Sequence, residues 1–298
     1  MLLSVNSFSD SYPRSLGEAV AFLGPAGTFT HQAVMADPVL AGKRQVPVST
    51  AAGVVEAVRA GVVGFGVLAW ENSVAGLVGA TLDLLATPPE RGASVWIERS
   101  VEIPVAFSLW GRGGASFEEI SVVASHSHAL AQCEGWLRGA LPGAALLATH
   151  STVAARGTAA ADATGRTAAI GAPGVVVADG LEVLADGVAD EAAASTRFVV
   201  LSQGAPAGGE DGERTLLACF QPVNRPGSLL PILEPFALAG VDLLHIESRP
   251  TRRKLGDYYF LLEVAAGPAR LGGVLAALAE ARMRVRVLGA LPGRLVAA

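Results

Sequence analysis

The segment 203–213 most constrains how this chain can fold, because it separates two stretches with different patterns. It contains glycine, proline and acidic residues without an apolar period, which is typical of a linker between domains. We therefore predict one unit over residues 19–202 and a second over residues 214–298. Residues 1–18 include no apolar run of the kind found in signal peptides, and we predict that they form a flexible leader.

The first unit alternates short apolar runs with helical stretches rich in Ala, Leu and Val. Because this alternation is typical of α/β proteins, we predict a largely parallel sheet, and its length favours two lobes around a cleft. The predicted strands are 19–23, 45–48, 64–69, 94–97, 105–109, 122–124, 168–170 and 198–201. The predicted helices include 51–59, 128–138 and 152–162.

The second unit has the order strand, helix, strand, strand, helix, strand. This βαββαβ order predicts a ferredoxin-like fold. Apolar residues recur at helical spacing in both helices, at Leu229, Ile232, Leu233 and Phe236 and at Leu271, Val274, Leu275 and Leu278. Pro235 conflicts with the first helix, because a proline inside a helix removes a backbone hydrogen bond and bends the axis.

Composition excludes several classes of protein. Hydrophobic residues make up 51% of the 298 residues and charged residues 16%, so the chain is not a disordered one. A net charge of −5 argues against a nucleic-acid partner. The longest apolar run, Gly61–Trp70, is far shorter than the roughly 20 residues of a membrane span. Cys133 and Cys219 lack metal-like spacing, so we predict buried free thiols in a cytoplasmic protein, with a catalytic cysteine as the alternative.

Polar groups follow the ends of two apolar strands in the first unit. The loop Gly24–Thr30 leaves a strand and opens a helix, so its hydroxyls and backbone N–H groups suit an anion, although a plain turn explains it equally well. Trp70–Gly76 follows another strand. Since α/β folds bind ligands at the carboxyl ends of strands, it is either a binding cluster or a helix cap at Asn72 or Ser73.

Three further patterns lie later in the chain. His126 and His128 have a spacing that metal ligands use, but no nearby carboxylate or cysteine completes a ligand set, so we predict no metal there. Gln132 follows His128 by four residues, which places both on one helix face. Polar residues also border apolar strands in Ser195–Phe198 and Ile246–Pro250, which suggests chemistry in the first unit and ligand sensing in the second.

These motifs stand in the order found in prephenate dehydratases, and the chain resembles that family over residues 19 to 290. The motifs are Gly24–Ala33 (GPAGTFTHQA), Glu71–Ser73 with Gly76, His128 followed by Gln132, Cys133, Trp136 and Leu137, Ser151 with Thr152, Thr196–Phe198 (TRF) and Glu247–Pro250 (ESRP). The TRF and ESRP elements are the most specific. The resemblance implies a two-lobed catalytic domain similar to type II periplasmic binding proteins, followed by a regulatory ACT domain.

The resemblance also implies roles for individual residues. Thr196 is implied as the key catalytic residue, with Asn72, Gln132 and Glu71 completing the catalytic set. The residues implied to bind substrate are Thr28, Phe29, Ser73, Gly76, Ser151, Thr152, Arg197 and Phe198. The residues implied to bind L-phenylalanine as an allosteric effector are Gly227, Ser228, Leu229, Leu230, Glu247, Ser248, Arg249 and Pro250.

By the same resemblance, we expect a lyase of phenylalanine biosynthesis that removes CO2 and a hydroxyl from prephenate to give phenylpyruvate. Aromatisation drives this reaction, so no metal or organic cofactor is expected. A homodimer or homotetramer is expected, because an isolated ACT sheet has edges free to pair. We expect no nucleic-acid or membrane partner.

Alternatives remain for one residue and for the activity. Arg197 either neutralises a substrate carboxylate or forms a structural ion pair with Asp186, Asp190 or Glu191. Within the same fold, an arogenate dehydratase or a non-aromatising prephenate decarboxylase is the alternative activity. A non-enzymatic amino-acid sensor is the alternative from a different class.

Overall fold

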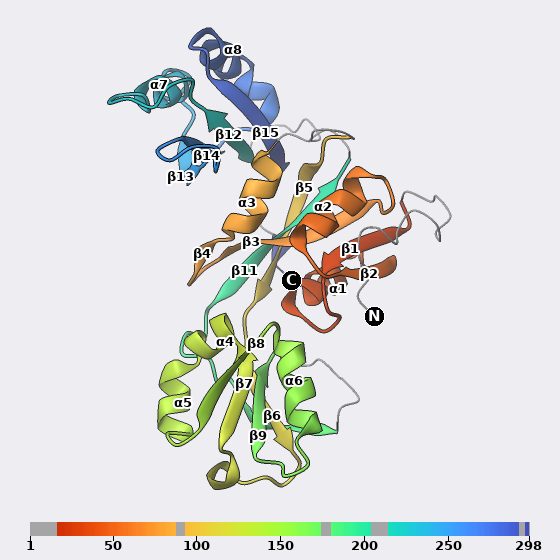
Figure 1. Ribbon diagram of the computed structural model, residues 1–298. Coiled ribbons are helices and arrows are strands. Elements are labelled where there is room, and N and C mark those ends of the chain that lie inside the picture. The colour runs from red at the N-terminus through yellow and green to blue at the C-terminus, as the bar shows by residue number, and fades with distance from the viewer. Residues whose placement is uncertain (1–16, 88–92, 174–179, 204–213, 292–295, 298) are drawn as a thin grey trace.

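The computed structural model describes residues 17–87, 93–173, 180–203, 214–291 and 296–297. The predicted leader up to residue 16 and residues 204–213 of the predicted linker lie outside the described residues. The strands form two sheets, one with eleven strands and one with five. Figure 1 shows a waist between the five-stranded lobe and the rest of the molecule. None of the helices in the described ranges is long and apolar enough to cross a membrane.

The central part of the large sheet comes from the first unit. Its elements are β1 (Ala19–Leu23), α1 (Phe29–Ala36), β2 (Arg44–Val48), α2 (Ala51–Arg59), β3 (Phe65–Asn72), β4 (Gly76–Leu77), α3 (Gly79–Ala86), β5 (Trp96–Pro104) and β11 (Ser195–Ser202). Across this part the order is β5-β11-β3-β1-β2. β1 pairs with β2 and β3 in parallel, but β11 runs antiparallel to both β3 and β5. The prediction of a largely parallel sheet is therefore wrong, because the late strand β11 returns through the middle of the sheet.

The five-stranded lobe holds the middle of the first unit. Its elements are β6 (Ser108–Arg112), a 3-10 turn (Phe117–Glu119), β7 (Val122–His126), α4 (Ser127–Gln132), α5 (Glu134–Ala140), β8 (Ala145–Thr149), α6 (Thr152–Ala161), β9 (Thr167–Gly171) and β10 (Leu181–Asp186). The strand order is β10-β6-β9-β7-β8. The helix predicted over 128–138 is two helices that meet at Cys133. β8 and β10 were not predicted, because they are edge strands with largely exposed residues and lack a buried apolar run.

The chain passes between the two lobes twice, after β5 and before β11. The two crossings lie side by side, since the backbone N–H of Val105 donates to the carbonyl of Ala194 at 2.7 Å. Figure 1 shows β5 and β11 extending down to this crossing point. The ends of β3 and β11 therefore lie where the lobes face each other.

The second unit follows the predicted order of elements. They are β12 (Arg214–Phe220), α7 (Leu230–Leu238), β13 (Leu243–Pro250), β14 (Tyr258–Val264), a 3-10 turn (Pro268–Leu271), α8 (Gly272–Glu280), β15 (Arg284–Leu291) and the short β16 (Val296–Ala297). The order β13-β14-β12-β15 is antiparallel throughout. Ile232 and Phe236 of α7 and Leu271, Val274 and Leu278 around α8 are buried against one face. α7 contains Pro235 and continues to Leu238.

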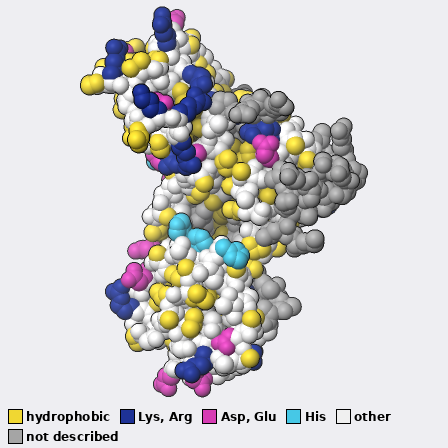
Figure 2. Space-filling view, viewed as in Figure 1, with side chains coloured by type: hydrophobic (Ala, Val, Ile, Leu, Met, Phe, Trp, Pro, Cys, Tyr) yellow, Lys and Arg dark blue, Asp and Glu magenta, His cyan; other side chains and the backbone are white. Residues whose placement is uncertain are grey.

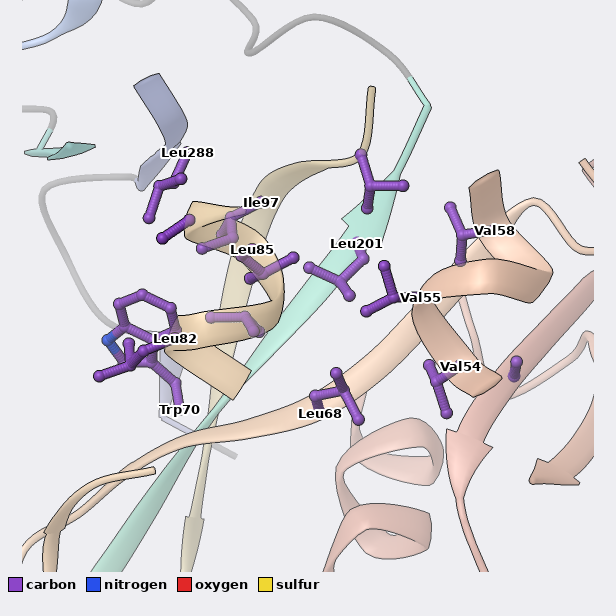
Figure 3. Packing of buried hydrophobic residues seen from close by; sticks show 14 of the residues in the cluster. Val54, Val55, Val58, Leu68, Trp70, Leu82, Leu85, Ile97, Leu201 and Leu288 are labelled. Carbon is purple, nitrogen blue, oxygen red and sulfur yellow. The ribbon is translucent and has the colours of Figure 1, made fainter. Parts of the chain in front are cut away.

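The opposite face of this second-unit sheet packs against the first unit. Leu216, Leu261 and Leu288 belong to the same buried cluster as Leu85 and Ile97, and Figure 3 shows Leu288 beside Ile97 and Leu85. β15 also pairs with β5. The two units therefore share one continuous hydrophobic core and one sheet.

Gly289 makes the contact between β15 and β5 possible. It lies opposite Ile97, and a Cβ on Gly289 would collide with the Ile97 carbonyl oxygen. A larger residue would force the strands apart, so glycine is required for this close approach.

Candidate active site

A cavity of about 440 Å³ lies between the two lobes. It is lined by the β1–α1 loop, the ends of β3 and β11, the segment 75–79 and the starts of α4 and α6. The structure thus brings together segments that are far apart in the sequence. The residues assigned from the sequence to catalysis or substrate binding that line it are Thr28, Phe29, Asn72, Gly76, Gln132, Ser151, Thr152, Thr196 and Phe198.

Thr196 and Asn72 form the central polar pair of this cavity. They lie opposite each other on neighbouring antiparallel strands, and the Asn72 Nδ2 donates to Thr196 Oγ1 at 2.9 Å. The Asn72 Oδ1 accepts from the backbone N–H groups of Val74 and Ala75, at 3.0 and 2.9 Å. These two bonds fix the orientation of the amide, so its NH2 group must face Thr196. The Thr196 hydroxyl therefore acts as acceptor toward Asn72 and keeps its own proton for a partner in the cavity.

The hairpin that carries Asn72 contradicts the helix-cap interpretation. β3 continues through Asn72 and turns into β4, and the following helix begins only at Gly79. Ser73 accepts from the backbone N–H of Ser195 at 2.9 Å, so its side chain fastens the hairpin to the start of β11. Ser73 does not line the cavity.

Glu71 and Arg197 are not brought to the cavity. Successive side chains of a strand point to opposite faces, so the neighbours of Asn72 and Thr196 point away from it. Arg197 instead pairs with Glu71 at 3.1 Å and with Glu263 of β14 at 3.2 Å. Arg197 is thus in structural ion pairs, but with partners other than the three acids considered from the sequence.

Two helices begin at the cavity wall. Thr28 caps α1 by accepting from the His31 N–H, and Ser151 caps α6 by accepting from the Ala154 N–H at 3.0 Å. The side chains of Thr28 and Ser151, which the sequence analysis assigned to substrate binding, therefore also serve as helix caps. The positive end of each helix dipole adds to the local attraction for an anion.

Histidines line the side of the cavity that belongs to the five-stranded lobe. His126, His128 and His150 all contribute, and Figure 2 shows histidine side chains gathered at the waist over a hollow. The sequence reasoning missed His150 because it lies just past the end of β8, a strand that was not predicted. Among the described residues, no group of three or more His, Cys, Asp or Glu side chains is arranged to hold a metal ion.

Both cysteines are buried free thiols, as predicted. Burial raises the pKa of Cys133 to about 12, and the charge of Asp190 contributes to the shift. Burial also raises the pKa of Cys219 to about 12. Neither thiol becomes a thiolate at neutral pH, which removes the alternative of a catalytic cysteine.

Successive side chains of β13 point to opposite faces of the sheet, so the predicted effector-binding residues on this strand do not all lie on one face. Glu247 and Arg249 lie on the face toward the first unit, where Arg249 pairs with Asp83 of α3 at 3.2 Å. Ser248 and Pro250 are exposed. The other predicted segment, 227–230, leads into α7 with Gly227 in the left-handed region, at φ 83°.

The family model and the curated relatives indicate the same family. A family model for prephenate dehydratase matches residues 20–206. A curated prephenate dehydratase from Corynebacterium glutamicum is 38% identical over 256 residues, which cover 83% of this chain and 78% of that protein.

Two solved structures are similar over most of their length. The crystal structure of a prephenate dehydratase from Arthrobacter aurescens in complex with L-Phe has a TM-score of 0.83 and 35% identity, covering 93% of this chain and 92% of that one. GqqA, described as a novel type of quorum quenching acylase, has a TM-score of 0.76 and 27% identity, covering 93% and 98%.

Proposed function

This chain belongs to the prephenate dehydratase family, and we propose that it converts prephenate to phenylpyruvate in the cavity between its lobes. The observation that carries the proposal is the Thr196 hydroxyl, which lies in the cavity with its proton free to be donated. In the reaction, the bond from the ring to its carboxylate breaks and releases CO2. Its electrons make the ring aromatic, the ring C–O bond breaks, and the hydroxyl takes up a proton and leaves as water.

Thr196 donates its hydrogen bond to the departing oxygen. One well-placed donor of this kind contributes about 2.7–4 kcal/mol to transition-state stabilisation. Asn72 positions the hydroxyl, and the Val74 and Ala75 N–H groups hold Asn72 in place. Phe198, which is 2% exposed, forms an apolar wall of the cavity. Such a wall favours loss of CO2, because a carboxylate is less well solvated there than in water.

The hydrogen bond at Thr196 argues against two other activities. An acyl-transfer enzyme needs a base that takes the proton of its nucleophile. The Asn72 amide presents a donor to Thr196, so this contact does not activate the hydroxyl as a nucleophile. A non-aromatising decarboxylase would not need a donor for a departing hydroxyl. Dehydration therefore fits the geometry best.

We further infer that residues 19–202 form a catalytic domain similar to type II periplasmic binding proteins and that residues 214–298 form an ACT domain. The proposed effector is L-phenylalanine, bound by the segments 227–230 and 247–250. Support comes from the βαββαβ topology and from the related Arthrobacter aurescens structure, which is a complex with L-Phe. The cytoplasmic location remains a prediction.

The first contact that supports regulation joins the proposed ACT domain to α3. Asp83 of α3 accepts from Arg249 at 3.2 Å and from the Tyr259 hydroxyl at 2.9 Å. Burial raises the pKa of Tyr259, and the hydrogen bond to Asp83 adds to the shift, so its hydroxyl remains a donor. The Arg249 guanidinium also lies against Gly79, which lines the cavity. A shift of β13 would therefore be felt directly at the cavity wall.

The second contact reaches the catalytic strands. Glu263 of β14 bonds Arg197 and Arg214, and Arg197 also bonds Glu71. Glu71 precedes Asn72 and Arg197 follows Thr196 in the chain, so this ion-pair group is covalently adjacent to both members of the catalytic pair. An effector that moves β14 can alter the Thr196 site only by binding one of two arrangements more tightly than the other.

We also propose a homodimer or homotetramer. β13 is an edge strand of the large sheet, and Leu244 and Ile246 on it are 47% and 42% exposed. Size-exclusion chromatography with light scattering tests this: a monomer at micromolar concentration would contradict it.

One assay tests the proposed activity. Purified full-length protein is incubated with prephenate, and phenylpyruvate is detected by the absorbance of its enolate in base. We expect production of phenylpyruvate at a rate proportional to the concentration of enzyme, with arogenate converted more slowly. No phenylpyruvate above the spontaneous background would exclude the proposed function.

Calorimetry tests the proposed effector. L-Phenylalanine should bind the intact protein and reduce the rate with prephenate, while D-phenylalanine should do neither. Absence of L-phenylalanine binding would exclude regulation by this ligand without affecting the proposed activity.

A further inference from the structure

The cavity lacks permanent positive charge among the described residues that line it. No lysine or arginine belongs to this set, and its titratable members are His126, His128 and His150. Prephenate, the substrate of the proposed function, carries two carboxylates. A dianion that leaves water needs compensating positive charge. The histidines are the groups in this lining that can supply it.

The histidines lie on the wall opposite the catalytic pair. His126 ends β7, His128 follows in α4 and His150 lies between β8 and α6, all in the five-stranded lobe. Thr196 and Asn72 belong to the other lobe. In prephenate, both carboxylates belong to substituents of one ring carbon, and the hydroxyl is on the ring carbon opposite. With its hydroxyl at Thr196, the substrate directs the ring carbon that carries the pyruvyl side chain toward the histidine wall.

His126 differs from the other two histidines. Its Nδ1 accepts from the backbone N–H of His128 at 3.3 Å, which leaves Nε2 to carry the proton of the neutral ring. Burial lowers the pKa of His126, and the neighbouring charge of His128 lowers it further. His126 is therefore a neutral donor. His128 and His150 are exposed and line the cavity.

The charged groups around this wall are engaged elsewhere. Asp190 accepts from the backbone N–H groups that open α5, and Arg156 of α6 packs 3.7 Å from the Trp110 ring. Glu134 pairs with Arg138 on the surface of α5, and the thiol of Cys133 is buried and neutral. No carboxylate belongs to the described lining of the cavity. An incoming dianion therefore does not compete with a protein acid for His128 and His150.

We propose that His128 and His150 form the subsite for the carboxylate of the substrate's pyruvyl side chain and that this subsite selects prephenate over arogenate. The inference rests on the proposed function. Arogenate carries an ammonium group where prephenate has a ketone, so an imidazolium nearby repels it. An imidazolium holds a carboxylate more strongly than a neutral imidazole does, and histidine loses that charge as pH rises. The KM for prephenate should therefore rise with pH, while kcat changes little.

Steady-state kinetics from pH 5.5 to 8.5 test the proposal, with both substrates. His128→Ala and His150→Ala should each raise the KM for prephenate about tenfold near pH 6, the cost of one charge-assisted hydrogen bond. The preference for prephenate over arogenate should fall by a similar factor. His128→Lys should keep a low KM up to pH 8, because lysine remains charged. The matched control is His245→Gln on β13, which should behave like the wild type. An unchanged KM and an unchanged preference in both alanine variants would overturn the proposal.

Direct binding separates this proposal from the proposed activity. Calorimetry with prephenate on the Thr196→Ala protein, with and without His128→Ala or His150→Ala, should show affinity that depends on each histidine and weakens with rising pH. Such binding without turnover in the wild type would contradict the dehydratase function and support the subsite. Binding of prephenate that is independent of both histidines, or no binding at all, would overturn the subsite.

Discussion

Replacing Glu263 by Gln tests the contact between the two units most sharply. The Glu263 side chain is 8% exposed and its carboxylate bonds Arg214 at 2.7 Å and Arg197 at 3.2 Å. Glutamine has nearly the same volume but carries no charge. Of the two partly buried arginines, Arg197 keeps its ion pair with Glu71, whereas Arg214 loses the carboxylate that it contacts in this group. Removing one partner of a buried ion pair lowers the free energy of unfolding by about 3–5 kcal/mol.

The two arginines retain some contact with water, at 15% and 14% exposure, which screens part of that cost. We therefore expect Glu263→Gln to lower the free energy of unfolding by about 2–3 kcal/mol. At roughly 2–4 °C per kcal/mol for a chain of this size, the midpoint of thermal unfolding should fall by about 4–12 °C.

Thermal unfolding followed by circular dichroism gives the measurement, with Glu134→Gln as the matched control. Glu134 pairs with Arg138 on the surface, where the two side chains are 62% and 73% exposed, and its loss should cost less than about 0.5 kcal/mol. In the double variant Glu263→Gln with Arg197→Gln, part of the lost stability should return, because one unpaired charge is gone. If Glu263→Gln unfolds at the wild-type temperature, the ion-pair group does not join the two units as argued.

Three further predictions follow from the site and the core. Asn72→Ala and Gln132→Ala should each lower kcat or raise KM with little change in melting temperature; a lower melting temperature with unchanged kinetics would show that these side chains are structural. Truncation after Gln203 should remove the response to L-phenylalanine and also lower thermal stability, because it exposes the shared core; a fragment as stable as the whole chain would contradict that core. Asp37 is buried, yet its hydrogen bond and ion pair with Arg99 hold its pKa below the usual value. It therefore stabilises the fold above about pH 4, a contribution that is lost as pH falls through the lowered folded pKa, so Asp37→Asn should flatten the acid limb of a stability profile.

The sequence analysis identified the polar residues at the ends of strands, but it did not predict which strands would become neighbours. Asn72 and Thr196 were both identified as residues at the margin of an apolar strand. Their hydrogen bond joins positions 124 residues apart. Which strands become neighbours depends on the packing of the whole sheet, and β11 inserts antiparallel between β3 and β5. Local hydrophobic patterns hold no information about that choice.

Glu71 and Arg197 show a limit of reasoning from motifs. A motif treats adjacent residues as one functional group, but the two-residue period of a strand sends neighbours to opposite faces. Applying that period to Glu71–Asn72 and Thr196–Arg197 would have separated the cavity residues from the ion pairs. The partner Glu263 could not have been predicted, because it lies on the far side of the predicted linker.

The division at the linker was also drawn more sharply than the packing supports. The βαββαβ order was read correctly from helical spacing and strand runs. However, the sheet face that carries Leu216, Leu261 and Leu288 packs against the first unit. From the sequence alone, a face covered by another unit and a face covered by its own helices have the same apolar alternation.

The central claim is that the Thr196 hydroxyl donates to the departing oxygen of prephenate, and kcat for substitutions at this position tests it most directly. Thr196→Ala should lower kcat by about 10²–10³-fold, the range for loss of one well-placed donor, and Thr196→Val should do the same with the shape preserved. Thr196→Ser, which keeps the hydroxyl, should retain most of the activity. All three variants should melt near the wild-type temperature. If Thr196→Val turns over prephenate as fast as Thr196→Ser, the hydroxyl does not take part in the reaction and the account of this site is wrong.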